Sequence, residues 1–180
     1  MSTTLLSPKK RRTIASNNAP LPTRRREWIQ RSIRWATTIC WAVLIGDLSS
    51  EGYGSSFTEL WLSQILSLFR LHPSPETLHL LNFLVRKLAH MTEYAIFAQL
   101  LYVGLLGADD LEWRPRTALW SALIAGAYSL TDEFHQSFVP NRTASLADCA
   151  LDTTGAILGL LVVFIVTRIR GSHKRVNGEL

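Results

Sequence analysis

The chain has 180 residues, a formal net charge of +5 and 47% hydrophobic residues, so its length accommodates one domain. Charge and hydrophobicity are segregated, because nine Lys or Arg residues lie among the first 34 positions and long later stretches hold almost none. The two cysteines, Cys40 and Cys149, both lie in apolar segments, which argues against a disulfide framework and against a CxxC metal site.

Residues 1–27 are predicted to form a disordered basic tail. They contain three prolines and few apolar residues, and such segments cannot bury enough surface to fold. The polar region is too long for a secretory signal, and no small-x-small cleavage site follows. A basic tail can touch anionic lipid or nucleic acid; next to apolar segments the lipid is favoured, and no nucleic-acid partner is expected.

Four later segments are predicted to cross a membrane, because a spanning helix needs about 20 mostly apolar residues. The first is the weakest, since its strongly apolar part begins only at Trp35, although arginines at its start can extend to the interface. The fold class is therefore an all-α transmembrane bundle of four helices within a domain at 28–169. The predicted spans are 28–48, 88–107, 117–134 and 147–167.

Segment 49–86, between the first two spans, is predicted to contain an additional helix. Its large apolar residues recur at helical spacing, which indicates an amphipathic helix on the outer surface; a packed helical hairpin is the alternative. Ser74-Pro75-Glu76 then has the residues of a helix start. The apolar residues of the first helix are Phe57, Leu60, Trp61, Ile65, Leu68 and Phe69.

The distribution of Lys and Arg predicts the orientation, since cytoplasmic segments carry the excess. The amino-terminal tail, the 108–116 loop and the carboxyl tail at 170–180 are basic, and they share one side of a four-span bundle. Both termini of a multi-pass cell-membrane protein are thus expected in the cytoplasm. The opposite side holds only Arg70, Arg86, Lys87 and Arg142.

Ionisable residues gather at the predicted outer ends of spans two to four. Such residues are costly inside a membrane and indicate a functional site, although a structural network that fixes helix register is the alternative. Gly155 and Gly159 are expected to let helices approach closely and to point Asp152 into the bundle. The cluster comprises Arg86, Lys87, His90, Glu93, Tyr94, Asp132, Glu133, His135, Gln136, Arg142, Asp148 and Asp152.

Three chemistries suit this set: general-base catalysis by a histidine, binding of a divalent metal, and binding of an anionic head group. No HExxH or paired-histidine spacing is present, so no metal is expected. The sequence also has no GxSxG, no phosphate-binding loop and no dinucleotide fingerprint, and no cofactor is expected.

The motifs resemble those of VanZ-like membrane proteins. Arg86-Lys87-Leu88-Ala89-His90 with Glu93-Tyr94 is similar to RKxxHxxEY. The stretch from Asp132 to Arg142 is similar to DExxQxFxPGR, and Asp148 with Asp152, Gly155 and Gly159 is similar to DxxxNxxGxxxG. The resemblance covers about residues 35–167. Two residues depart from the pattern: Asn141 replaces a glycine, and Asp152 replaces an asparagine and would need a partner such as Lys87 or Arg142.

The resemblance implies a bacterial cell-envelope protein, and the family's namesake lowers sensitivity to teicoplanin. It implies no agreed substrate, so the function is predicted from the site: binding or modifying an anionic lipid-linked envelope component at the outer leaflet. Membrane lipid or a lipid-linked precursor is the expected partner, and whether a reaction is catalysed stays open.

The roles predicted for the site residues fall into three groups. The anion-binding residues are Arg86, Lys87 and Arg142. The residues that orient groups or transfer protons are His90, Asp132, Glu133 and Gln136. The supporting residues are Glu93, Tyr94, His135, Asp148 and Asp152. A non-enzymatic scaffold is the alternative function, and a transporter, which would require an oligomer, is a third.

Overall fold

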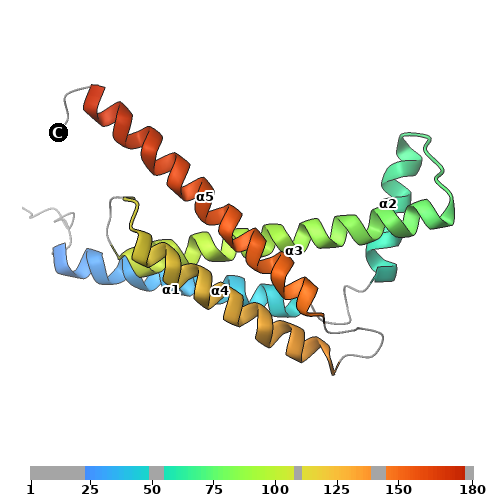
Figure 1. The fold of residues 1–180 in the computed structure, drawn as a ribbon, viewed down its shortest axis with the longest axis horizontal. Coiled ribbons are helices and arrows are strands. Elements are labelled where there is room, and N and C mark those ends of the chain that lie inside the picture. Colours follow the sequence, from blue (N-terminus) through green and yellow to red (C-terminus); the bar gives the residue numbers. More distant parts are fainter. Residues whose placement is uncertain (1–22, 49–54, 108–110, 139–144, 177–180) are drawn as a thin grey trace, which may run out of the picture.

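The computed structural model describes residues 23–48, 55–107, 111–138 and 145–176, which form five helices and no strand. The helices α1 and α3 run lengthwise, α4 and α5 run obliquely to them, α5 crosses α3, and α2 lies across the far end of α3 (Figure 1). Helix α3 is central, because it contacts each of the other four. The predicted all-helical fold is confirmed for these residues. The helices are α1 (Thr23–Leu48), α2 (Ser55–Leu68), α3 (Pro75–Leu106), α4 (Pro115–Gln136) and α5 (Leu146–Val176).

One stretch of the described residues, Leu146–His173 in α5, is by itself long and apolar enough to cross a membrane, with a mean hydropathy of 2.2 over its most apolar 18 residues. The other three predicted spans coincide with parts of α1, α3 and α4. Their hydropathy is lowered by the basic start of α1 and by the polar residues in α3 and α4. The four-helix transmembrane arrangement therefore stays a prediction.

Helix α3 begins where its capping residues predict. Ser74 Oγ accepts a hydrogen bond from the backbone N–H of Thr77 at 3.4 Å, and Pro75 occupies the first turn. The pKa of Glu76 is lowered, first by a hydrogen bond to its own backbone N–H and then by the Ser74 hydroxyl. The helix ends at Gly107, whose φ of 65° is in the left-handed region.

Two helices extend beyond the predicted domain limits. Helix α1 begins at Thr23 and α5 ends at Val176, so residues 23–27 and 170–176, which the sequence placed in tails, are helical. The arginine, glutamate and lysine residues at these ends are good helix formers, so the helices do not stop where the apolar residues do. Residues 1–22 and 177–180 lie outside the described residues.

Helix α2 combines features of both structures considered for its segment. It packs on α3, where Glu59 Oε2 lies 3.3 Å from His79 Nδ1. Its large apolar side chains nevertheless stay exposed, among them Phe57, Trp61 and Leu68. The helix is thus half of a packed pair and presents an apolar outer surface.

The α3–α5 crossing depends on two glycines. A Cβ atom at Gly155 would lie 2.8 Å from Met91 Cα, and one at Gly159 would lie 2.8 Å from Ala95 Cα. Real Cβ atoms do not approach backbone so closely, so these positions require glycine. The predicted close approach is confirmed, and it sets the register between the two helices that carry most of the site.

Candidate functional site

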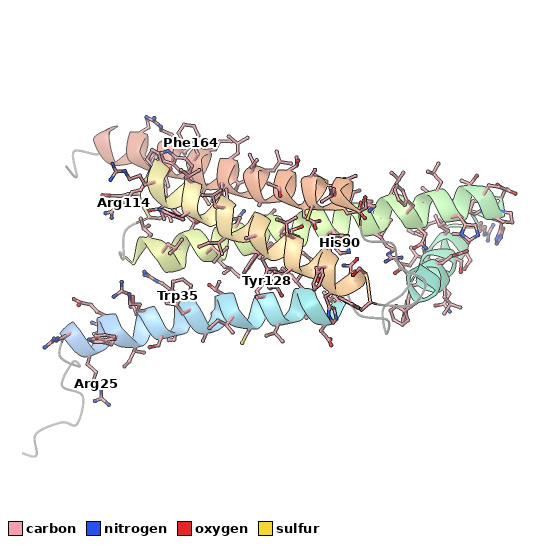
Figure 2. The ribbon with its side chains drawn as sticks, turned by 60° about the horizontal axis from the view of Figure 1, so that its bottom comes forward. Arg25, Trp35, His90, Arg114, Tyr128 and Phe164 are labelled. Carbon is pink, nitrogen blue, oxygen red and sulfur yellow. The ribbon has the colours of Figure 1, made fainter. Side chains whose placement is uncertain are left out.

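Polar residues of α3, α4 and α5 converge at one end of the bundle. We call this set the polar cluster: Lys87, His90, Glu93, Asp132, Glu133, Gln136, Asp148 and Asp152. Figure 2 shows His90 beside α4 and α5 toward this end, with Arg25 and Arg114 at the opposite end. The structure thus brings together eight of the twelve residues that the sequence singled out.

The α3 and α5 residues of the cluster face each other at two levels. At the outer level Lys87 Nζ forms an ion pair with Asp148. One turn further in, His90 Nδ1 lies 3.9 Å from Asp152 Oδ1 and 4.0 Å from Glu93 Oε2. These two distances exceed those of hydrogen bonds, so the contacts are electrostatic and depend on a protonated imidazole.

Asp152 is buried and pairs with Ser129 and not with Lys87, one of the two partners that the sequence suggested; the other, Arg142, lies outside the described residues. Its Oδ2 accepts a hydrogen bond from Ser129 Oγ at 2.8 Å, while Lys87 pairs with Asp148. The reason is helix register. Helices α3 and α5 run in the same direction, so Asp148 lies level with Lys87 and Asp152 lies level with His90. The prediction that Asp152 points into the bundle is confirmed by its 2% exposure.

The end of α4 contributes two more buried carboxylates. Asp132 Oδ2 accepts a hydrogen bond from Gln136 Nε2 at 3.0 Å, one helical turn away. Glu133 Oε2 accepts the backbone N–H of Ser145 at 2.8 Å, just before α5 begins. The Glu133 contact joins the start of α5 to the end of α4.

These motifs belong to a stretch that matches a known family model, described as VanZ/LLP1, over residues 34–167. The chain belongs to the VanZ-like family. No curated protein and no solved structure matches it. Family membership supports the grouping of the motifs, and the roles of single residues in this VanZ-like chain stay predictions.

Four residues that the sequence singled out are not members of the polar cluster as defined above. His135 is exposed, because the buried face of α4 runs through Ser129, Asp132, Glu133 and Gln136 and leaves it outside. Arg142 lies outside the described residues. Arg86 is half-buried. Tyr94 is completely buried against the cluster, near Ser129, Asp132 and Asp152.

Sequence reasoning missed three residues that support the site of this VanZ-like chain. Ser129 and Ser145 donate to Asp152 and Glu133, and Trp41 Nε1 donates to the backbone oxygen of Glu93 at 3.0 Å. The signal for Ser129 was its place one turn before Asp132 and Glu133 on the same face. Trp41 gave no signal, because its contact depends on how α1 docks.

The donor set favours proton handling and anion binding over metal binding. Within the described ranges, no three His, Cys, Asp or Glu side chains are arranged to hold a metal ion. The carboxylates are instead held by Lys87, Ser129, Gln136 and a backbone N–H. A lysine at the rim with a histidine and acids below it can bind a charged group and move a proton.

Proposed function

We propose that this chain is a cell-membrane protein that spans the bilayer with α1, α3, α4 and α5, with α2 outside and both termini in the cytoplasm. Its polar cluster binds or modifies an anionic, lipid-linked envelope component at the outer leaflet. The observation that supports this most is that three separate helices deliver charged residues to one end of the bundle.

A gradient of exposure supports a ligand that enters from the outer side. The Lys87 and Asp148 side chains are 24% and 31% exposed, whereas the Asp152 side chain one turn deeper is 3% exposed. A phosphate or carboxylate can therefore reach Lys87 by displacing Asp148, and His90 lies directly below it. In this proposal Arg86, Lys87 and Arg142 bind the anion, and His90, Asp132, Glu133 and Gln136 orient groups or transfer protons.

A non-enzymatic scaffold is the second candidate, and the hydrogen bonding of the cluster favours it. Most of the carboxylates already have a donor or cation from another part of the chain, as expected of a network that fixes helix positions. In that case the polar cluster is structural, and the exposed apolar surface of α2 recruits a partner.

A pair of substitutions distinguishes the two functions. Asp148→Asn removes the competitor for Lys87, so an anion-binding site retains phosphatidylglycerol more tightly, whereas Lys87→Gln weakens retention about tenfold. The measurement is native mass spectrometry of the delipidated protein, titrated with phosphatidylglycerol and with phosphatidylcholine of the same chains.

The scaffold gives a different result in the same experiment. Both substitutions break one ion pair, so both lower the thermal stability alike and leave the preference between the two lipids unchanged. Equal lipid retention in the wild type, Lys87→Gln and Asp148→Asn would therefore rule out anion binding at Lys87.

The family resemblance adds a cellular readout to this proposal. If the bound component belongs to the envelope target of teicoplanin, expression of the chain in a sensitive host raises the inhibitory concentration of the drug. Lys87→Gln abolishes that effect while the protein still inserts, as shown by its amount in washed membranes. An unchanged inhibitory concentration with the wild-type chain would remove the resistance role and leave the binding proposal in place.

A further inference from the structure

A pocket of about 310 Å³ lies between α1 and α3, next to the polar cluster. This volume is at the lower end of the range for small-molecule sites, which is about 300–1,000 Å³. All but two of the lining side chains are hydrocarbon or indole, the exceptions being Thr92 and Glu93. The lining residues are Trp41, Leu44, Ile45, Leu48, Ala89, Thr92, Glu93 and Ile96.

Helices α1 and α3 run in opposite directions, so residue numbers that rise along α1 fall along α3. This order defines two ends of the pocket, an inner end toward Leu100 and an outer end toward Ala89. Thr38 Oγ1 donates to the backbone oxygen of Leu100 at 3.3 Å, and Trp41 Nε1 donates to that of Glu93 at 3.0 Å. Continuing this register brings Leu48, the last residue of α1, to the level of Ala89. The indole of Trp41 therefore marks the inner end, and the outer end lies beside the first turns of the predicted span.

The wall of the pocket on α3 continues outward to a basic residue. Positions 86, 89, 93 and 96 follow one helical face, so Arg86 lies one turn beyond Ala89 on the same side. Arg86 is half-buried at that level. Glu93 lines the pocket from within, and His90 Nδ1 is 4.0 Å from its carboxylate. The pocket is thus an apolar slot with a basic residue beyond its outer end. Through Glu93 it adjoins the imidazole of His90 in the polar cluster.

We propose that this pocket holds a hydrocarbon chain of an anionic lipid, with the head group at Arg86 and Lys87. The inference rests on the proposed function and names its ligand class, a membrane amphiphile whose hydrocarbon chain the protein binds. Hydrocarbon lining suits a chain, and positive charge at the outer end suits an anionic head group. The arrangement brings the junction between chain and head group to Glu93 and His90.

The test fills the pocket without disturbing the bundle. Ala89 and Thr92 are exposed, so Ala89→Phe and Thr92→Phe are expected to fold and to occupy the slot with a ring. Each weakens retention of phosphatidylglycerol about tenfold in native mass spectrometry, since part of the chain is excluded. Ala150→Phe is the matched control, because Ala150 is exposed on α5 and does not line the pocket. It leaves retention unchanged.

A second measurement locates the chain directly. Phosphatidylglycerol with a diazirine near the middle of its chain is photolysed on the wild-type protein, and crosslinked peptides are sequenced. Crosslinks are expected on residues 41–48 and 89–96 and are lost in Ala89→Phe. Crosslinks spread over all exposed apolar helix faces, which indicate ordinary bilayer contact, would overturn the proposal.

The outcomes separate this inference from the function on which it rests. If Ala89→Phe retains phosphatidylglycerol normally while Lys87→Gln loses the preference for it, the pocket is wrong and anion binding stands. If neither substitution changes retention, both are wrong. Arg86→Gln tests head-group binding and chain binding separately. It is expected to lower the preference for phosphatidylglycerol over phosphatidylcholine and to keep the crosslinks on residues 41–48.

Discussion

At the scale of single residues, Asp152 shows how the site is stabilised. A buried carboxylate inside a membrane helix is costly unless donors or cations surround it. Here Ser129 donates to one oxygen at 2.8 Å, and His90 lies 3.9 Å from the other. The aspartate at this position therefore depends on Ser129 and His90 together.

Removing the donor tests this dependence. Ser129→Ala leaves the Asp152 oxygen without its hydrogen bond, so the free energy of unfolding falls by about 0.6–1.7 kcal/mol, the range for hydrogen bonds between membrane helices. Ser121→Ala is the control, because Ser121 is equally buried on α4 but donates only to Thr117 within its own helix at 2.8 Å. Denaturation in mixed micelles measures both, and an equal loss would contradict the role of Ser129.

Replacing the carboxylate by an amide gives the complementary expectation. Asp152→Asn keeps an oxygen that accepts from Ser129 and removes a buried negative charge, so the melting temperature stays equal or rises. In that background Ser129→Ala costs less, since a neutral acceptor is cheaper to leave unpaired than a carboxylate. A fall in melting temperature with Asp152→Asn would show that the charge itself stabilises the fold through His90.

The sequence predicted which residues gather and not which ones pair. Depth along each span follows from hydropathy, so Lys87, His90, Asp132 and Asp148 were expected at one level. Their partners depend on the rotation and register of helices that are separate in sequence. Lys87 was therefore predicted to pair with Asp152 but pairs with Asp148. His135 was predicted to belong to the cluster, but its side chain is exposed and lies off the buried face of α4.

At the scale of helices, the α3–α5 crossing is the main determinant of the site. Gly155 and Gly159 place α5 against the backbone of Met91 and Ala95, between the levels of the cluster and the core. Hydropathy and caps predicted that these helices exist and that α3 begins at Ser74-Pro75. They did not predict that α1 and α5 continue through charged residues to Thr23 and Val176, because hydropathy marks the end of an apolar stretch and not the end of a helix.

A methyl group at the crossing is expected to be destabilising. Gly155→Ala puts a Cβ against Met91 backbone atoms, which must move, so stability falls by about 1–3 kcal/mol as in overpacked cores. Gly171→Ala is the matched control on the same helix, because nothing lies within 4 Å of its added Cβ. Thermal unfolding in detergent compares the two, and a similar melting temperature for both variants would contradict the close crossing.

The docking of α1 has its own test. Trp41→Phe removes the hydrogen bond to the Glu93 backbone oxygen and lowers the stability by about 1 kcal/mol. Trp120→Phe is the control, since Trp120 is largely exposed on α4 and its change stays within about 0.5 kcal/mol. Denaturation monitored by helix content measures both. If the two variants unfold alike, α1 does not rest on α3 through Trp41.

At the scale of the whole molecule, the proposed function depends on which side of the membrane the polar cluster faces. The two ends of the bundle differ in charge: Arg25 and Arg114 lie at one end and the cluster at the other (Figure 2). The excess of Lys and Arg at the first end predicts that it is cytoplasmic. The cluster would then face outward, where a lipid-linked envelope component is accessible.

Cysteine labelling in intact cells tests this most directly. In a background with Cys40 and Cys149 replaced by serine, one cysteine is introduced at Ser137, exposed at the cluster end of α4, or at Glu112, exposed at the opposite end. A membrane-impermeant maleimide is expected to label Ser137→Cys on intact cells and Glu112→Cys only after permeabilisation. Labelling of Glu112→Cys alone on intact cells would place the cluster in the cytoplasm and contradict the proposed function.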